Sequence, residues 1–153
     1  MFAYRIGGSA HPLLDGSGAW ASDHARWNSR GRYIIYAAEH YATALLERAA
    51  QLNSVPFPPG LLYIRVEIPS DAAIEELAPE ALGGWDADDK SASQAYGDRW
   101  YDEKRSLVLI VPSLAAPGIE RTVLINQRHA AFARVKASPA APCVCHPMLR
   151  LRG

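Results

Sequence analysis

The sequence lacks an excess of charge of either sign, and it lacks any long hydrophobic run. Its 153 residues include 16 Lys and Arg against 16 Asp and Glu. This balance provides no extended basic surface for the phosphate backbone of duplex nucleic acid, so we expect no direct nucleic-acid partner. No apolar stretch approaches the roughly 20 residues that cross a bilayer, so we expect no membrane segment.

Cysteine is scarce, and its placement excludes a disulfide framework. Cys143 and Cys145 are separated by one residue, which is too close to brace a domain. His146 follows them, but a structural zinc site usually needs a fourth ligand and a wider cysteine spacing, so we expect no metal site. The start, Met1–Gly7, lacks the charged leader, apolar core and cleavage site of a signal peptide. We therefore expect a protein of the reducing cytoplasm.

Common signatures of nucleotide-binding and hydrolytic enzymes are also missing. The chain has no Walker phosphate loop, no Gly-x-Gly-x-x-Gly between a strand and a helix, and no serine in a Gly-x-Ser-x-Gly elbow. On the residues alone, Gly16-Ser17-Gly18 is a flexible loop.

A chain of this length can bury enough surface to fold without disulfides or a metal, and we expect residues 1–153 to form a single domain. Strands are predicted where β-branched and aromatic residues crowd together or alternate with polar ones, at residues 2–6, 33–37, 62–68, 107–111, 122–125 and 132–135. Helices are predicted at residues 39–52, 71–77 and 91–103, the last weakened by Gly97, with a turn at 83–85. The order of these elements indicates an α+β fold.

Glu47 lies away from the apolar stripe of its predicted helix. The stripe comprises Ala42, Leu45, Leu46 and Ala49, and Glu47 falls roughly 140° from the centre of its last three members, at ~100° per residue. Periodicity therefore favours a solvated glutamate. The same geometry also lets the carboxylate point into a cleft, if that face of the helix lines one.

Arg26-Trp27-Asn28 combines large side chains with turn-forming residues. One interpretation is that Trp27 anchors a loop to the core while Arg26 is solvated. The other is that Arg26 clamps an anion, since the guanidinium fork matches a phosphate with paired hydrogen bonds. Arg5 lies in the first predicted strand, and an arginine that faces the interior needs a carboxylate or a ligand phosphate to offset its desolvation.

Further polar residues stand at the ends of predicted strands. Ser113 ends a buried strand, where a hydroxyl often caps backbone groups. Asn126 and His129 follow another strand end, where turns and binding sites both occur. Position alone does not separate these roles.

Taken together, these residues resemble the RES-domain family, the toxin components of RES–Xre toxin–antitoxin modules. The matching segments occur in order across nearly the whole chain, and their order and spacing make the resemblance fairly specific. They are Tyr4-Arg5, Asp15-Gly16-Ser17-Gly18-Ala19, Arg26-Trp27-Asn28-Ser29 with Gly31, Tyr36, Ala44-Leu45-Leu46-Glu47, Gly97-Asp98-Arg99-Trp100, Val111-Pro112-Ser113, and Ile125-Asn126 with His129. The chain departs from the family at Asp23-His24-Ala25, because family members often have glycines at these positions. The resemblance therefore does not predict the backbone path of this loop.

The resemblance implies a central, mostly antiparallel sheet with flanking helices, similar to ADP-ribosyltransferases of the diphtheria-toxin type. It also implies an enzyme that consumes NAD⁺ as a substrate and needs no cofactor. The implied catalytic residues are Arg26, Tyr36, Glu47 and Ser113. The residues implied to bind NAD⁺ are Arg5, Arg26, Trp27, Asn28, Tyr36, Ser113, Asn126 and His129.

Cleavage of the nicotinamide–ribose bond gives each residue a task within that resemblance. Glu47 would stabilise the positive charge that develops on the ribose. The arginines would hold the pyrophosphate, and Tyr36 would stack on the nicotinamide or the ribose edge. Ser113 would orient the ribose or the nicotinamide amide by a hydrogen bond.

The acceptor of ADP-ribose stays open. Water or phosphate would make the protein a toxin that hydrolyses or phosphorolyses NAD⁺, whereas a cytosolic protein acceptor would make it a mono-ADP-ribosyltransferase. A non-catalytic nucleotide-binding or interaction domain is a third alternative. The family pairing implies an Xre-like helix-turn-helix antitoxin as a partner, which would carry any DNA binding.

Overall fold

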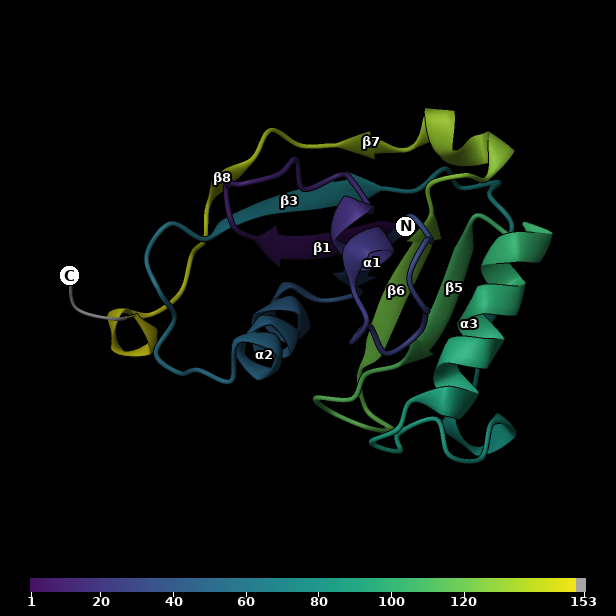
Figure 1. Ribbon diagram of the computed structural model, residues 1–153. Helices are drawn as coiled ribbons and strands as arrows, with labels where there is room; N and C mark the ends of the chain where they lie inside the picture. Colours follow the sequence, from purple (N-terminus) through teal and green to yellow (C-terminus); the bar gives the residue numbers. More distant parts are fainter. Residues whose placement is uncertain (151–153) are drawn as a thin grey trace.

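Eight strands join in one sheet in the computed structural model, which describes residues 1–150 (Figure 1). Their order is β4-β5-β6-β2-β1-β3-β7, with β8 also paired to β3, and only β4 and β5 run parallel. The expected α+β fold with a mostly antiparallel sheet is therefore confirmed. The strands are β1 (Phe2–Gly7), β2 (Ile34–Ala38), β3 (Leu62–Glu67), β4 (Ile74–Glu76), β5 (Val108–Pro112), β6 (Arg121–Asn126), β7 (Lys136–Ala137) and β8 (Ala141–Pro142).

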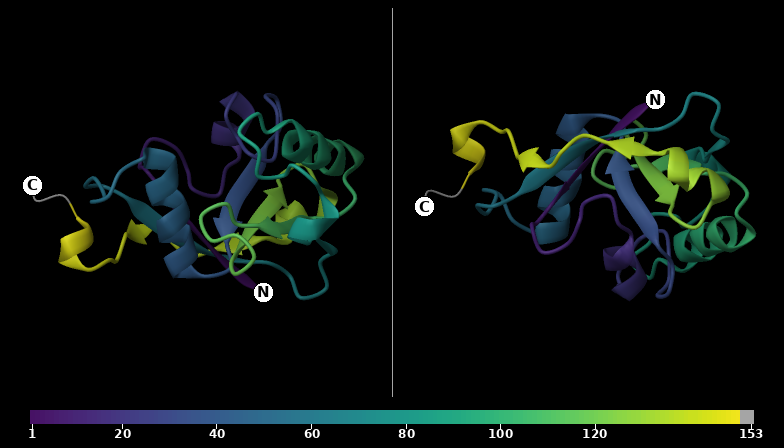
Figure 2. Two further views of the ribbon diagram at one scale, coloured as in Figure 1. Left: turned by 90° about the horizontal axis from the view of Figure 1, so that it is seen from below. Right: turned by 90° about the horizontal axis from the view of Figure 1, so that it is seen from above.

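Two longer helices cover different halves of this sheet (Figure 2). α2 (Tyr41–Leu52) packs mainly on β1 and β2, and α3 (Ser91–Glu103) packs on the half that contains β5 and β6. Within residues 1–150, no helix has the length and apolar character needed to cross a membrane. The helices are α1 (Ser17–Ala21), α2 (Tyr41–Leu52) and α3 (Ser91–Glu103), with 3₁₀ turns η1 (Pro79–Ala81), η2 (Ala130–Arg134) and η3 (Pro147–Leu149).

β1 and β2 meet at one register pair, Tyr4 opposite Ala38, whereas β1 and β3 pair along their full length from Phe2 to Gly7. The two halves of the sheet therefore diverge from this point. Figure 1 shows β1 and β3 running across the direction of β5 and β6. This divergence opens the sheet where the candidate site lies.

β5 is buried on both faces, as its unbroken apolar run predicts. Val108 and Ile110 pack into the core cluster on one face, and Leu109 and Val111 pack into the cluster on the other. That second cluster also contains Trp100 of α3, so it ties the helix to the sheet.

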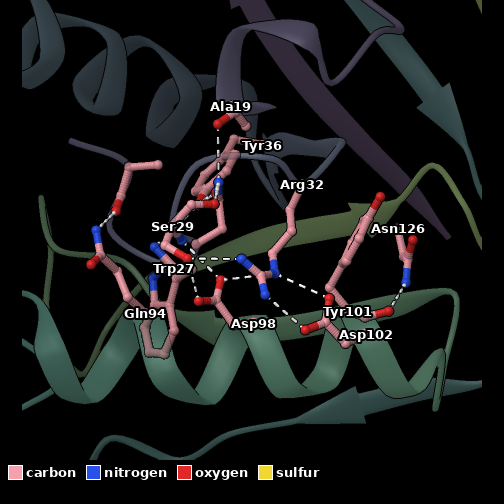
Figure 3. Close-up of polar contacts among 12 residues, drawn as sticks. Ala19, Trp27, Ser29, Arg32, Tyr36, Gln94, Asp98, Tyr101, Asp102 and Asn126 are labelled. Carbon is pink, nitrogen blue, oxygen red and sulfur yellow. Dashed lines mark hydrogen bonds and ion pairs between the residues drawn. The ribbon is translucent and has the colours of Figure 1, made fainter. Parts of the chain in front are cut away.

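Gly97 lets α3 approach the backbone at Trp27. A Cβ atom at position 97 would lie 1.8 Å from the carbonyl oxygen of Trp27, so no other residue fits this contact. The next residue, Asp98, accepts hydrogen bonds from the backbone N–H and the hydroxyl of Ser29, at 2.8 and 2.5 Å, and pairs with Arg32 at 3.3 Å (Figure 3). α3 therefore fixes the segment from Trp27 to Arg32 against the sheet.

The short helix predicted at 71–77 is wrong. Ile74–Glu76 forms β4, the parallel edge strand beside β5. Backbone bonds hold it there, from Leu107 N–H to the Ala73 carbonyl at 3.1 Å and from Leu77 N–H to the Ile110 carbonyl at 2.8 Å. Pairing with a distant strand overrides the local preference of this segment.

The strand predicted at 132–135 is also wrong, because this segment belongs to η2. His129 precedes the turn, and its Nδ1 accepts a hydrogen bond from Ala131 N–H at 3.1 Å. This cap supplies a local partner for the backbone and starts the 3₁₀ turn. The other predicted strands, and the helices at 39–52 and 91–103, are confirmed within two residues at either end.

The apolar stripe predicted for α2 is rotated relative to the structure. Ala42 is exposed and Leu46 is 48% exposed, whereas Thr43 and Ala44 are buried. This rotation turns the face that carries Glu47 toward the sheet, and the solvated glutamate favoured by periodicity is wrong. Where α2 lies close to the sheet, short side chains such as those of Thr43 and Ala44 are buried. A pattern of hydrophobic residues alone does not identify such a contact.

We expect Gly97→Ala to lower the free energy of unfolding by about 3 kcal/mol, because the added methyl group collides with backbone rather than with a movable side chain. Urea denaturation measures the difference. Gly18→Ala is the matched control, since it adds the same methyl group within α1 with no atom inside 4 Å. Equal stability of the two variants would contradict the proposed contact.

Candidate active site

A cleft of about 650 Å³ lies over β1, β2 and β6, between α2 and the segment that runs from α1 to Trp27. It is the place where the two halves of the sheet diverge. The fold gathers side chains from separate elements here, and five predicted site residues line the cleft: Arg5, Arg26, Trp27, Tyr36 and Glu47.

Two hydroxyl groups hold the carboxylate of Glu47. Ser113 Oγ donates to Glu47 Oε1, and Thr122 Oγ1 donates to the same oxygen at 3.0 Å. Both residues are buried, Ser113 directly after β5 and Thr122 within β6. Within residues 1–150 no hydrogen bond reaches the other oxygen, Oε2, so one carboxylate oxygen is available to a ligand.

Arg5 is a partly buried cation in the cleft. Burial, together with the nearby positive charge of Arg48, lowers its pKa to about 10, and Asp15 partly opposes this shift. Within the described part of the chain, Arg5 forms no ion pair at contact distance. A ligand anion is therefore the partner that this guanidinium lacks.

Arg26 and Trp27 both line the cleft, and both also hold the surrounding chain in place. Arg26 Nη1 donates to the carbonyl oxygens of Trp85 and Ala87, at 3.2 and 2.5 Å, and its buried Nε has no acceptor among residues 1–150. Trp27 is 2% exposed and stacks on Trp85 with ring centroids 6.1 Å apart. Trp27 therefore anchors the segment, and both residues also form the wall of the cleft.

Tyr36 lines the cleft, and its hydroxyl holds the wall in place. The hydroxyl accepts from Trp27 N–H at 3.1 Å and donates to Asn28 Oδ1 at 2.6 Å. Burial raises the pKa of Tyr36 above its ordinary value. The hydroxyl therefore remains protonated near neutral pH, and a role as general base is excluded.

Asn28 is buried behind the wall rather than in the lining of the cleft. Its Nδ2 donates to the Ala19 carbonyl at 3.0 Å, which connects the segment to α1. Asn28 thus braces Tyr36 and α1 from behind.

Asn126 and His129 lie outside the cleft lining. Asn126 is buried, donates to the Tyr101 carbonyl at 3.1 Å and accepts from Arg128 N–H at 2.9 Å. Figure 3 shows it near Tyr101, at the other end of the row of contacts from Trp27. His129 caps η2. The structure therefore does not bring these two residues together with Glu47.

Arg48 and Thr122 line the cleft and were missed from the sequence. Arg48 directly follows Glu47, but the misplaced stripe of α2 hid its orientation. Thr122 stands in an apolar strand and shows its role only through strand register, which places it opposite Ala38 and Val111. Among residues 1–150, no three His, Cys, Asp or Glu side chains form a group that could hold a metal.

The chain matches a known protein family over most of its length. The RES domain model matches residues 2–146. The Prs ADP-ribosylating toxin of Sphingobium sp. is 36% identical over 128 residues, which cover 81% of this chain and 78% of that protein. Toxin Res of Pseudomonas putida is 33% identical over 131 residues, which cover 84% of this chain and 86% of that protein.

A solved structure has the same fold. The crystal structure of the M. tuberculosis MbcT–MbcA toxin–antitoxin complex contains a chain that matches with a TM-score of 0.69 and 22% identity, over 92% of this chain and 82% of that one. The match shows a common architecture, and the family model and the relatives above establish the kinship. The chain belongs to the RES domain family.

Proposed function

We propose that this protein is the toxin of a toxin–antitoxin pair and that it cleaves the nicotinamide–ribose bond of NAD⁺. The observation that carries the proposal is the meeting, in a single cleft, of one hydroxyl-held carboxylate, Glu47, with arginines that have no carboxylate partner among residues 1–150. A dinucleotide offers both a ribose for the carboxylate and a diphosphate for the arginines. The kinship with proteins named Toxin Res supports the biological role.

Glu47 stabilises the reacting ribose in this proposal. The bond between ribose C1′ and the nicotinamide nitrogen breaks, nicotinamide leaves with the electron pair, and positive charge develops on the sugar. The carboxylate stabilises that charge, directly or through a ribose hydroxyl. Ser113 and Thr122 keep the side chain oriented, so little reorganisation is needed when the charge appears.

The remaining lining residues bind and orient NAD⁺. The arginines of the cleft contact the phosphates, and the ring of Tyr36 provides a flat apolar surface for the nicotinamide or ribose. Trp27 is 2% exposed and supports the wall beside it. Asn28 supports this wall from behind, which replaces the direct contact expected from the sequence. NAD⁺ is a substrate here, so no redox cofactor is required.

Two kinds of acceptor define two versions of the reaction. Water or phosphate captures the ribose in an NAD⁺-degrading toxin. A protein side chain captures it in a mono-ADP-ribosyltransferase, and the relative named Prs ADP-ribosylating toxin, at 36% identity, favours this second candidate.

Mass spectrometry of NAD⁺ incubated with the purified protein distinguishes these versions. We expect free nicotinamide, together with ADP-ribose in water or its phosphate ester when phosphate is added. Intact NAD⁺ in buffer, with an ADP-ribose mass added to one protein in lysate, would identify the transferase. Intact NAD⁺ and unmodified proteins under all three conditions would refute NAD⁺ cleavage and favour a non-catalytic nucleotide-binding domain.

Glu47→Gln tests the catalytic carboxylate. The amide keeps an oxygen that accepts from Ser113 and Thr122 but removes the negative charge, so we expect folding to persist and nicotinamide release to fall at least 100-fold. Circular dichroism and the rate of nicotinamide release are the measurements. Glu80→Gln, at an exposed position outside the cleft, is the matched control. Wild-type turnover by Glu47→Gln would contradict a catalytic role for the Glu47 carboxylate.

The cognate partner in this proposal is an Xre-like antitoxin that covers the cleft. Apolar side chains at its edge favour such a contact, because Leu46 of α2 is 48% exposed and Leu114, which lines the cleft, is 44% exposed. We expect the stoichiometric complex to release no nicotinamide from NAD⁺ while the separated toxin does. Full turnover by the intact complex, verified by size-exclusion chromatography, would contradict a covered cleft.

A further inference from the structure

Arg48 faces the same cleft as Arg5, one residue after Glu47 on α2. The two guanidinium groups are close enough that the charge of Arg48 lowers the pKa of Arg5. Desolvation also lowers the pKa of Arg48 itself. Two like charges thus share a partly buried space, which is unfavourable in the absence of an anion.

The polar contacts of Arg48 leave most of its hydrogen-bonding capacity unused. Nη1 donates to Gln51 Oε1 at 3.2 Å, one turn along α2, and this contact orients the side chain. Nε is buried and has no acceptor among residues 1–150. An arginine that served only as a solvated helix residue would keep Nε in water, so burial of this atom points to a ligand.

Arg26, at the other wall, is less available for an anion. Its Nη1 is already shared between two backbone carbonyl oxygens, those of Trp85 and Ala87. Arg5 and Arg48 have no such carbonyl partners for their side chains within residues 1–150. The pair Arg5–Arg48 therefore offers the larger number of unused N–H donors, and a diphosphate offers matching acceptors.

We propose that Arg48 is a specificity-determining residue that, together with Arg5, binds the diphosphate and thereby selects a dinucleotide over a mononucleotide. The inference rests on the proposed function for the identity of the substrate. The diphosphate of NAD⁺ is attached through C5′ of the same ribose whose C1′ reacts. An anion site adjacent to Glu47 therefore holds the near end of the substrate when the carboxylate reaches the ribose.

Binding of ADP and of adenosine, measured by isothermal titration calorimetry, tests the inference without relying on turnover. We expect Arg48→Gln to weaken ADP binding by about 10-fold or more, because a charge-assisted pair of hydrogen bonds is lost. Adenosine has no phosphate, so its affinity stays within about twofold of wild type. Arg48→Lys keeps the charge but loses the fork, and it gives an intermediate affinity for ADP.

Kinetics provide a second measurement. We expect Arg48→Gln to raise the KM for NAD⁺ more than it lowers kcat, since the diphosphate is bound in both the ground and transition states. The ratio of kcat/KM for NAD⁺ to that for nicotinamide mononucleotide falls in parallel. Arg99→Gln, an exposed charge change on α3, is the matched control and leaves both parameters at wild-type values.

Several outcomes would overturn the inference. They are an ADP affinity in Arg48→Gln within twofold of wild type, an equal loss of adenosine binding, or no ADP binding by the wild-type protein. A raised KM for inorganic phosphate with unchanged ADP affinity would assign the arginine pair to a free phosphate instead. If wild type binds ADP in an Arg48-dependent manner but does not cleave NAD⁺, the diphosphate site stands and the proposed reaction fails.

Discussion

The partial burial of several cations beside one carboxylate is the constraint on which the site depends. Arg5, Arg26 and Arg48 converge on the cleft, and Glu47 is the acidic residue that lines it within the described chain. Guanidinium groups that lose water without gaining a carboxylate are destabilising. An anionic ligand removes this cost, so the charges that disfavour the empty cleft favour its occupied form.

Regular structure, rather than loops alone, holds the two walls of the cleft. Glu47 reaches its position because α2 packs on β1 and β2 and because hydroxyls at the ends of β5 and β6 receive its carboxylate. Trp27 reaches its position because α3 lies against its backbone and Asp98 fixes the following turn. Each wall thus depends on residues far away in the sequence.

Local sequence patterns correctly predicted the elements with a strong hydrophobic period. They failed where pairing with a distant segment decided the structure. The apolar run of β5 and the alternation in β3 predicted buried and half-buried strands correctly. β4 was missed because its pairing partner lies more than 30 residues away. Arg5, Arg26 and Glu47 were found through the family resemblance, whereas Arg48 and Thr122 required the orientation of α2 and the register of β6.

The close approach of Gly97 to Trp27 has a consequence for how a ligand enters the cleft. With backbone packed on backbone and Trp27 stacked on Trp85, the aromatic wall has no room to shift toward α3. The wall is therefore already in its final shape before a ligand arrives, and association does not have to order this segment. Recognition on this side of the cleft then works by complementarity to a rigid surface, and any adjustment falls to the ligand and to the side chains opposite.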